Sequence, residues 1–125
     1  MLRVLSVGLF IVLATNGVAM LAAPSWWYSA VPGVPATGPF NAHFVRDIGA
    51  AYLVSGAGVG WYAMRPALGW SALVAAAAFL DLHALIHIHD AVLSPVCGRE
   101  LLRDLPGVFI PAILASALAL AARVR

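Results

Sequence analysis

The sequence predicts an all-α integral membrane protein, a bundle of four transmembrane helices, from three observations. Of the 125 residues, 63% are hydrophobic and only 10% are charged, whereas soluble domains carry roughly 25% charged residues. The apolar residues gather in four runs, each close to the ~20 residues that a helix needs to cross the hydrocarbon core. The runs are continuous, whereas the strands of a membrane barrel would alternate apolar and polar residues. The predicted spans of this single membrane domain are approximately 4–23, 42–64, 68–89 and 105–122.

The first span is compatible with a retained helix or with a cleaved signal peptide. Arg3 precedes the apolar run, and an alanine-rich stretch at 19–23 follows it. The run is longer than the about 7–15 apolar residues of a signal-peptide core. This length favours a retained transmembrane helix.

The second span is predicted to follow a long interfacial loop. Residues 24–40 contain several prolines and the triplet Trp-Trp-Tyr; proline interrupts helices, and these aromatic side chains suit the headgroup layer. Asn41 is a suitable N-cap for the span, and Pro66 follows its end. Gly56 and Gly60 have the spacing of small residues that lets helices approach closely, which predicts a central position for this helix.

Polar residues end the third span, and prolines mark the fourth. The third span is predicted to end near His89, and residues 94–104 are predicted to form a loop. Pro106 then falls in the first turn of the fourth span, where a missing N–H group costs little. Pro111 lies deeper and predicts a kink.

The arginines at the ends of the spans predict the orientation. Four lie on the side of the termini and two on the other side: Arg3, Arg65, Arg123 and Arg125 against Arg99 and Arg103. Because the side richer in basic residues is cytoplasmic, both termini are expected in the cytoplasm. All basic residues are single arginines, a pattern that orients helices and does not indicate nucleic-acid binding. The lone Cys97 excludes an internal disulfide.

Ionisable residues of the second and third spans are expected at one membrane level, near the periplasmic face. His43, Arg46 and Asp47 share one helix face, within roughly 100° of the circumference. On the third span, His83, His87 and Asp90 fall within about 60°. These two sets are predicted to face each other, whereas Asp81 and His89 point elsewhere.

Three interpretations fit this cluster. Imidazoles at positions i and i+4 can bind one metal ion, which makes a candidate donor set of His43, Asp47, His83, His87 and Asp90. Mixed nitrogen and oxygen donors suit zinc, iron, manganese or copper, and two of the histidines could instead be the axial ligands of a haem. Arg46 would repel a cation, so the alternative is a structural network in which Arg46 forms an ion pair with an acidic residue, Asp81 above all. A proton or solute path is a third interpretation.

A family resemblance adds to this interpretation. The stretch from Gly38 to Gly49, Gly-Pro-Phe-Asn-Ala-His-Phe-Val-Arg-Asp-Ile-Gly, together with the later helix that carries His83 and His87, resembles segments of small, functionally uncharacterised bacterial four-span proteins, broadly of the DoxX-like kind. The resemblance implies a bacterial inner-membrane protein with a four-helix bundle. It brings no catalytic residues with it.

The sequence therefore predicts a small bacterial inner-membrane protein that binds a ligand or assists a partner. The alternatives are a metal- or haem-dependent membrane redox enzyme and a component of proton or small-solute transport. The lipid bilayer is the expected partner. A homo-oligomer or a larger membrane complex is also expected, because four short helices enclose too little room for transport by one chain.

Overall fold

The computed structural model describes residues 1–123, and these fold into α-helices. The long helices are α1 (Leu2–Ala22), α3 (Ala42–Met64), α4 (Pro66–Leu93) and α6 (Ile110–Arg123). Shorter elements are α2 (Pro24–Ala30), the 3₁₀ turn η1 (Val34–Ala36), α5 (Cys97–Asp104) and the π-helical segment η2 (Leu105–Phe109). Three continuous helices are long and apolar enough to cross a membrane: Leu2–Ala22, Pro66–Leu93 and Cys97–Arg123.

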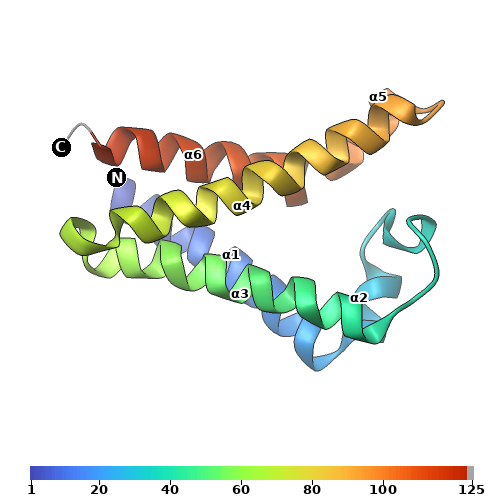
Figure 1. The fold of residues 1–125 in the computed structure, drawn as a ribbon, viewed down its shortest axis with the longest axis horizontal. Coiled ribbons are helices and arrows are strands. Elements are labelled where there is room, and N and C mark those ends of the chain that lie inside the picture. The colour runs from blue at the N-terminus through green and yellow to red at the C-terminus, as the bar shows by residue number, and fades with distance from the viewer. Residues whose placement is uncertain (124–125) are drawn as a thin grey trace.

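The long helices lie alternately antiparallel (Figure 1). α1 and α3 form one pair, α4 and α6 form the other, and α3 also packs against α4. The start of α1, the end of α6 and the short α3–α4 connection lie at one end of the bundle, which we call the arginine end after Arg3, Arg65 and Arg123. The pairs diverge toward the opposite end, where α2, η1 and α5 lie. We call this second end the histidine end, after His83 and His87 on α4.

The boundaries of α3 follow from local chemistry. The Asn41 side chain accepts hydrogen bonds from the backbone N–H groups of His43, at 3.0 Å, and Phe44, at 3.2 Å. This is the capping arrangement that the sequence predicts, and it satisfies donors that the first turn leaves free. At the other end, α3 stops at Met64 and α4 begins with Pro66.

Glycines bring α1 and α3 into close contact. A Cβ atom on Gly49 would lie 2.7 Å from the Met20 Cβ and 3.1 Å from the Gly17 carbonyl oxygen. Further along α3, a Cβ on Gly56 would lie 3.4 Å from the Leu13 Cβ. The close helix contact expected of the small residues in this span is therefore present, and it is made with α1.

The core lies between the two helix pairs and consists of aliphatic and small residues. Leu13 of α1, Val59 of α3, Leu73 of α4 and Leu118 of α6 are almost completely buried. Many other apolar side chains point outward, for example those of Val54 and Leu82. Outward-facing apolar side chains around a thin core are typical of a helix bundle whose solvent is lipid.

The structure corrects two predicted loops and one span boundary. Residues 24–40 contain helix α2 and turn η1, and residues 97–104 of the predicted 94–104 loop form helix α5. The last long helix therefore begins before Pro106, which lies inside the π-helical segment Leu105–Phe109 and not in a first turn. Pro106 predicts a first turn because proline lacks the N–H group of an α-helical hydrogen bond, but the wider π turn accommodates it inside the helix.

We expect Gly49→Ala to destabilise the protein by about 1–3 kcal/mol, because the new methyl group would overlap α1. Gly8→Ala is the matched control, since a Cβ there meets nothing within 4 Å, and it should be neutral or slightly stabilising. Unfolding of both variants in detergent micelles measures the difference. Equal stability of the two would show that α1 and α3 do not approach as described.

Candidate functional site

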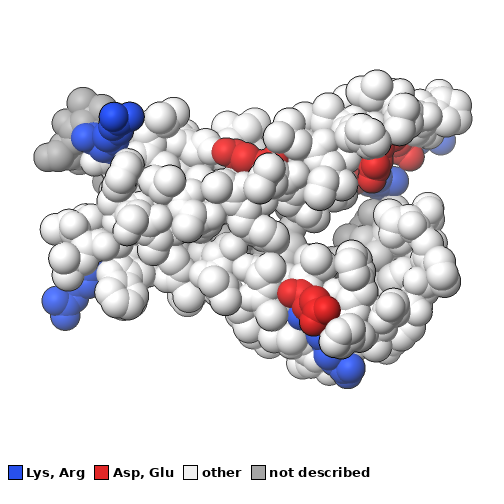
Figure 2. Space-filling view, viewed as in Figure 1, with Lys and Arg blue, Asp and Glu red and all other residues white. Residues whose placement is uncertain are grey.

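A cavity of about 540 Å³ lies at the histidine end of the bundle. Its walls come from α1, α2, η1 and the chain that follows it, α3, α4 and α5. Figure 2 shows the hollow between the two diverging parts of the molecule. Met20, Val45 and Ile48 contribute apolar wall, and polar groups come mainly from α4 and α5. The volume falls within the about 300–1,000 Å³ of small-molecule sites, which combine an apolar lining with a few placed polar groups.

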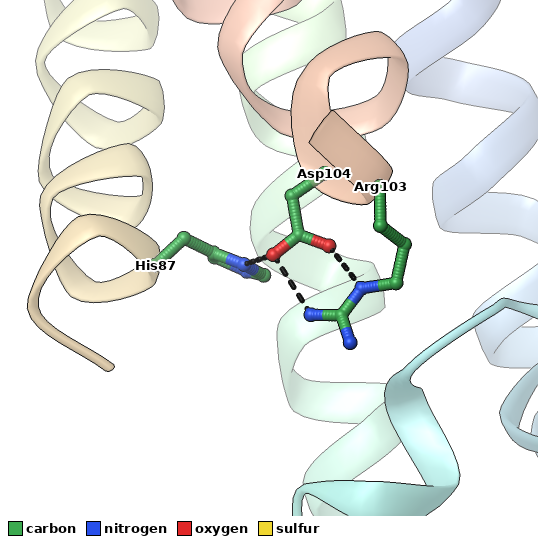
Figure 3. Close-up of polar contacts among 3 residues, drawn as sticks. All are labelled: His87, Arg103 and Asp104. Atoms are coloured by element: carbon green, nitrogen blue, oxygen red, sulfur yellow. Dashed lines mark hydrogen bonds and ion pairs between the residues drawn. The ribbon is translucent and has the colours of Figure 1, made fainter. Parts of the chain in front are cut away.

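Asp104 forms the polar centre of this cavity. Its side chain is only 9% exposed. Arg103 donates to both carboxylate oxygens, from Nε to Oδ1 at 2.6 Å and from Nη2 to Oδ2 at 3.0 Å. His87 Nδ1 lies 2.7 Å from Oδ2, so two residues from two helices converge on one carboxylate (Figure 3). Such bidentate, charge-assisted hydrogen bonds hold a buried carboxylate in one position.

The same carboxylate orients the imidazole of His87. A carboxylate paired with arginine can only accept hydrogen bonds, so His87 Nδ1 must carry the proton that lies between them. In the neutral ring the other nitrogen, Nε2, then has a free lone pair. Within residues 1–123 no hydrogen bond involves Nε2, and His87 lines the cavity. The ring can therefore accept a hydrogen bond from a hydroxyl or amide group in the cavity.

The loop between α2 and η1 contacts the other side of Arg103. Gly33 has φ +88°, a conformation that favours glycine, and a Cβ there would overlap the Arg103 guanidinium. The Tyr28 hydroxyl holds the chain that follows η1 by donating to the Gly38 carbonyl oxygen at 2.6 Å, and its ring packs 5.2 Å from the ring of Phe40. Arg103 thus joins the α4–α5 side of the cavity to the loop that covers it.

The position of Asp104 depends on the prolines that follow it. Asp104 is the last residue of α5, directly before the π-helical segment. Pro111 cannot donate to the carbonyl of Gly107, and its ring would clash with that carbonyl in a regular α-helix. The wider turn before Pro111 relieves this conflict, and such single π turns are frequent at functional sites.

A column of aromatic rings extends from His87 toward the middle of the bundle. The rings of His87 and His83 meet edge to face at 4.8 Å. His83 stacks on Phe79 at 6.1 Å and meets Tyr52 edge to face at 5.7 Å. The contacts are between ring surfaces, so the column supports the orientation of His87 through packing.

The structure does not bring the predicted residues of α3 to this cavity. His43 Nε2 lies 3.3 Å from Asp47 Oδ2, and the two side chains are 87% and 61% exposed. Arg46 Nε donates to the Leu21 carbonyl oxygen at 3.4 Å, near the C-terminus of α1. The expected meeting of this face with the histidines of α4 is absent, because apolar residues such as Val45 take the inward position.

Three of the predicted residues on α4 do share one wall. His83, His87 and Asp90 line the cavity together, as their helical spacing predicts. His89 points away from it and lies beside the Asp90 side chain, with its Nδ1 atom 3.2 Å from Asp90 Oδ1, on an exposed surface.

The predicted ion pair between Arg46 and Asp81 is not formed. Ser116 of α6 instead donates to Asp81 Oδ2 at 2.7 Å. Asp81 therefore links α4 to α6, on the side of α4 away from Arg46, and the sequence could not reveal a serine partner so distant in the chain.

Metal binding remains a prediction. Within the described part of the chain, no three or more His, Cys, Asp or Glu side chains lie close enough together to hold a metal ion. The predicted donors are divided, because His43 and Asp47 lie outside the cavity and His83, His87 and Asp90 line it. The metal content and visible absorption of the purified protein would test both the metal and the haem prediction.

Sequence reasoning missed Arg103 and Asp104 as members of the site. It assigned them to a polar loop and used Arg103 only for orientation. The available signal was an adjacent Arg-Asp pair directly before an apolar span, where a carboxylate needs a partner.

The chain matches no known family model, no curated protein and no solved structure at a significant level. The fold by itself defines a class: an all-α protein with three long apolar helices that could cross a membrane, which suggests a multi-pass membrane protein. The site must then be interpreted from its own geometry.

We expect Asp104→Asn to lower the free energy of unfolding by about 1–3 kcal/mol, because it leaves the Arg103 charge without its carboxylate. It should also change the tautomer of His87, since an amide does not require the proton on Nδ1. Unfolding in micelles and ¹⁵N NMR of labelled histidine measure the two effects. Asp90→Asn, at an exposed carboxylate, is the control and should leave both unchanged. An unaltered His87 signal in Asp104→Asn would contradict the described hydrogen bond.

Proposed function

We propose that this chain is a four-span protein of the bacterial inner membrane, with both termini in the cytoplasm, that binds a small amphipathic molecule in the cavity at its histidine end. In this orientation the cavity opens toward the periplasm. The observation that carries the proposal is an apolar cavity whose polar groups gather around one buried carboxylate, Asp104.

The direction of the helices supports the fourth span. α1 and α4 run the same way along the bundle, so if both cross the membrane the chain must cross back between them. α3 is the segment that connects the two ends. Its 23 residues extend about 34 Å, enough for a hydrocarbon core of about 30 Å. It is less apolar than the other three, and its glycines are covered by protein: Gly49, Gly56 and Gly60 by α1, and Gly58 by α4.

The distribution of charge supports the orientation. Figure 2 shows arginines without acidic residues at the end that holds the termini, on the face drawn. The carboxylates lie at or toward the other end, where Glu100 and Asp104 accompany Arg99 and Arg103. Basic residues without acidic neighbours are typical of the cytoplasmic side.

The chemistry of the cavity indicates the class of ligand. The wall from Met20, Val45 and Ile48 suits an apolar body. In the neutral ring the hydrogen bond to Asp104 places the proton on Nδ1, so His87 Nε2 can accept one hydrogen bond. A molecule with an apolar ring or chain and one hydroxyl or amide donor therefore fits better than a metal ion or a strongly charged solute.

The aromatic column favours binding over proton transport. A proton path needs consecutive hydrogen bonds or water between ionisable groups. His83 meets its neighbours through ring contacts, and among residues 1–123 it takes part in no side-chain hydrogen bond. The rings therefore act as a packed support beneath the site.

Reporter fusions test the topology. A fusion after residue 123 and one in the α3–α4 connection should report the cytoplasm, and fusions at Ser29 and Ser94 should report the periplasm. If α3 does not cross the membrane, the α3–α4 connection and Ser29 would report the same side. That result would remove the periplasmic opening of the cavity.

Filling the cavity tests ligand binding. Solvent extraction and mass spectrometry of the purified wild-type protein should detect a small amphipathic compound, which Ile48→Trp should lose because the larger side chain occupies the cavity. Val54→Trp, on the same helix but 74% exposed outside the core, should retain it. Equal amounts in both variants, or no compound in the wild type, would contradict the proposal.

A further inference from the structure

A second cavity lies at the opposite end of the molecule, outside the site described above. It has a volume of about 810 Å³ and lies where the start of α1, the α3–α4 connection and the end of α6 come together. Its polar lining consists of Arg3, Tyr62, Trp70 and Arg123, together with Met1. Arg3 and Arg123 are thus brought together from opposite ends of the described chain.

The charge of this lining has one sign. Among the described residues, no aspartate or glutamate lines this cavity, whereas the cavity at the histidine end includes Asp90, Glu100 and Asp104. Two guanidinium groups that share a recess repel each other unless an anion lies between them. The guanidinium group is also the side chain best suited to phosphate, which it can bind through two parallel hydrogen bonds.

The structure orients Arg3 in advance. Its Nε atom donates to the Ala63 carbonyl oxygen at 2.9 Å, and Nη2 lies 3.5 Å from the Met64 carbonyl oxygen. These bonds hold the guanidinium over the C-terminus of α3, and they do not involve Nη1. A group held this way loses little conformational entropy when it binds a ligand.

Tyr62 supplies a second polar group. The residue is only 5% exposed, and within residues 1–123 its hydroxyl makes no hydrogen bond to protein. Among the described residues, every side-chain polar atom without accessible surface has a hydrogen-bond partner. The hydroxyl must therefore keep some accessible surface, and the cavity that Tyr62 lines is where that surface lies.

Trp70 places the cavity at the level of the lipid headgroups. It lies at the start of α4, and its Nε1 donates to the Ala119 carbonyl oxygen at 3.0 Å, which joins α4 to α6 beside the cavity. Trp61 lies close by on α3 and is 54% exposed. Tryptophan at helix ends is typical of the boundary between hydrocarbon and headgroups.

We infer that this cavity binds the phosphate headgroup of an anionic phospholipid, with Arg3 and Arg123 on the phosphate oxygens and the Tyr62 hydroxyl as a further donor. The apolar wall of Leu2, Ala67 and Ala122 then faces the first part of the lipid chains. Basic recesses between transmembrane helices are known to accept such headgroups. The inference needs the arginine end to lie at a membrane surface and does not depend on a ligand at the histidine end.

The test uses the full chain in micelles and native mass spectrometry. Wild-type protein should retain phosphatidylglycerol at least about tenfold better than phosphatidylcholine, and phosphatidylglycerol should raise its unfolding temperature by several degrees more. Arg3→Gln with Arg123→Gln should lose both differences. Tyr62→Phe, which keeps the ring and hence the packing, should weaken retention without abolishing it. Arg46→Gln with Arg99→Gln, at two exposed arginines of the other end, changes the net charge by the same amount and should behave as wild type.

Three outcomes would overturn the inference. The first is equal retention of the two lipids by wild-type protein. The second is an equal loss in the variant that combines Arg46→Gln with Arg99→Gln, which would indicate net charge alone. The third is the same thermal protection by inorganic phosphate, which would make the ligand a soluble phosphate and not a lipid. Because the comparison is between lipids within each variant, a lower stability of the arginine variants does not obscure it.

Discussion

The histidine end of the molecule depends on the carboxylate of Asp104. It lies at the junction of α5 and the π-helical segment, and it is almost buried. Arg103 neutralises it, and His87 connects it to α4. Removing a charge from water is costly unless such partners are present. The same contacts position Arg103 against the loop at Gly33, which covers the cavity. They also determine which nitrogen of His87 carries the proton, and hence which hydrogen bond this ring can offer to a ligand.

The fold was largely predictable because its determinants are local. Apolar runs and the Asn41 cap define α1 and α3 within a few residues, and the glycines of α3 correctly indicated close packing. The predicted loops were partly wrong for a related reason. Pro106 indicated the first turn of the fourth span, but a π turn accommodates this proline and the continuous helix begins at Cys97.

Only part of the site could be predicted. Helical spacing shows which residues share a face of one helix, but it does not show whether that face points into the bundle or outward. His83, His87 and Asp90 share a face, and they line the cavity. On α3 the polar face of His43 and Asp47 turned outward, since the interior accepts Val45 and Tyr52 at lower cost. Asp104 was missed because its partner on α4 lies 17 residues earlier in the chain and is reached only through the fold.

Asp81 provides a physical reason to expect that this protein assembles with other chains. It lies midway along α4, exposed among outward-facing residues such as Leu82 and Leu85. Ser116 provides one hydrogen bond, which leaves most of the carboxylate's hydrogen-bonding capacity unused. A carboxylate at the centre of a bilayer costs about 2.5–3.5 kcal/mol on insertion scales. A polar group from a second chain against α4 and α6 would remove much of that cost. Contact with protein at this face of α4 and α6 would therefore cost less than contact with lipid.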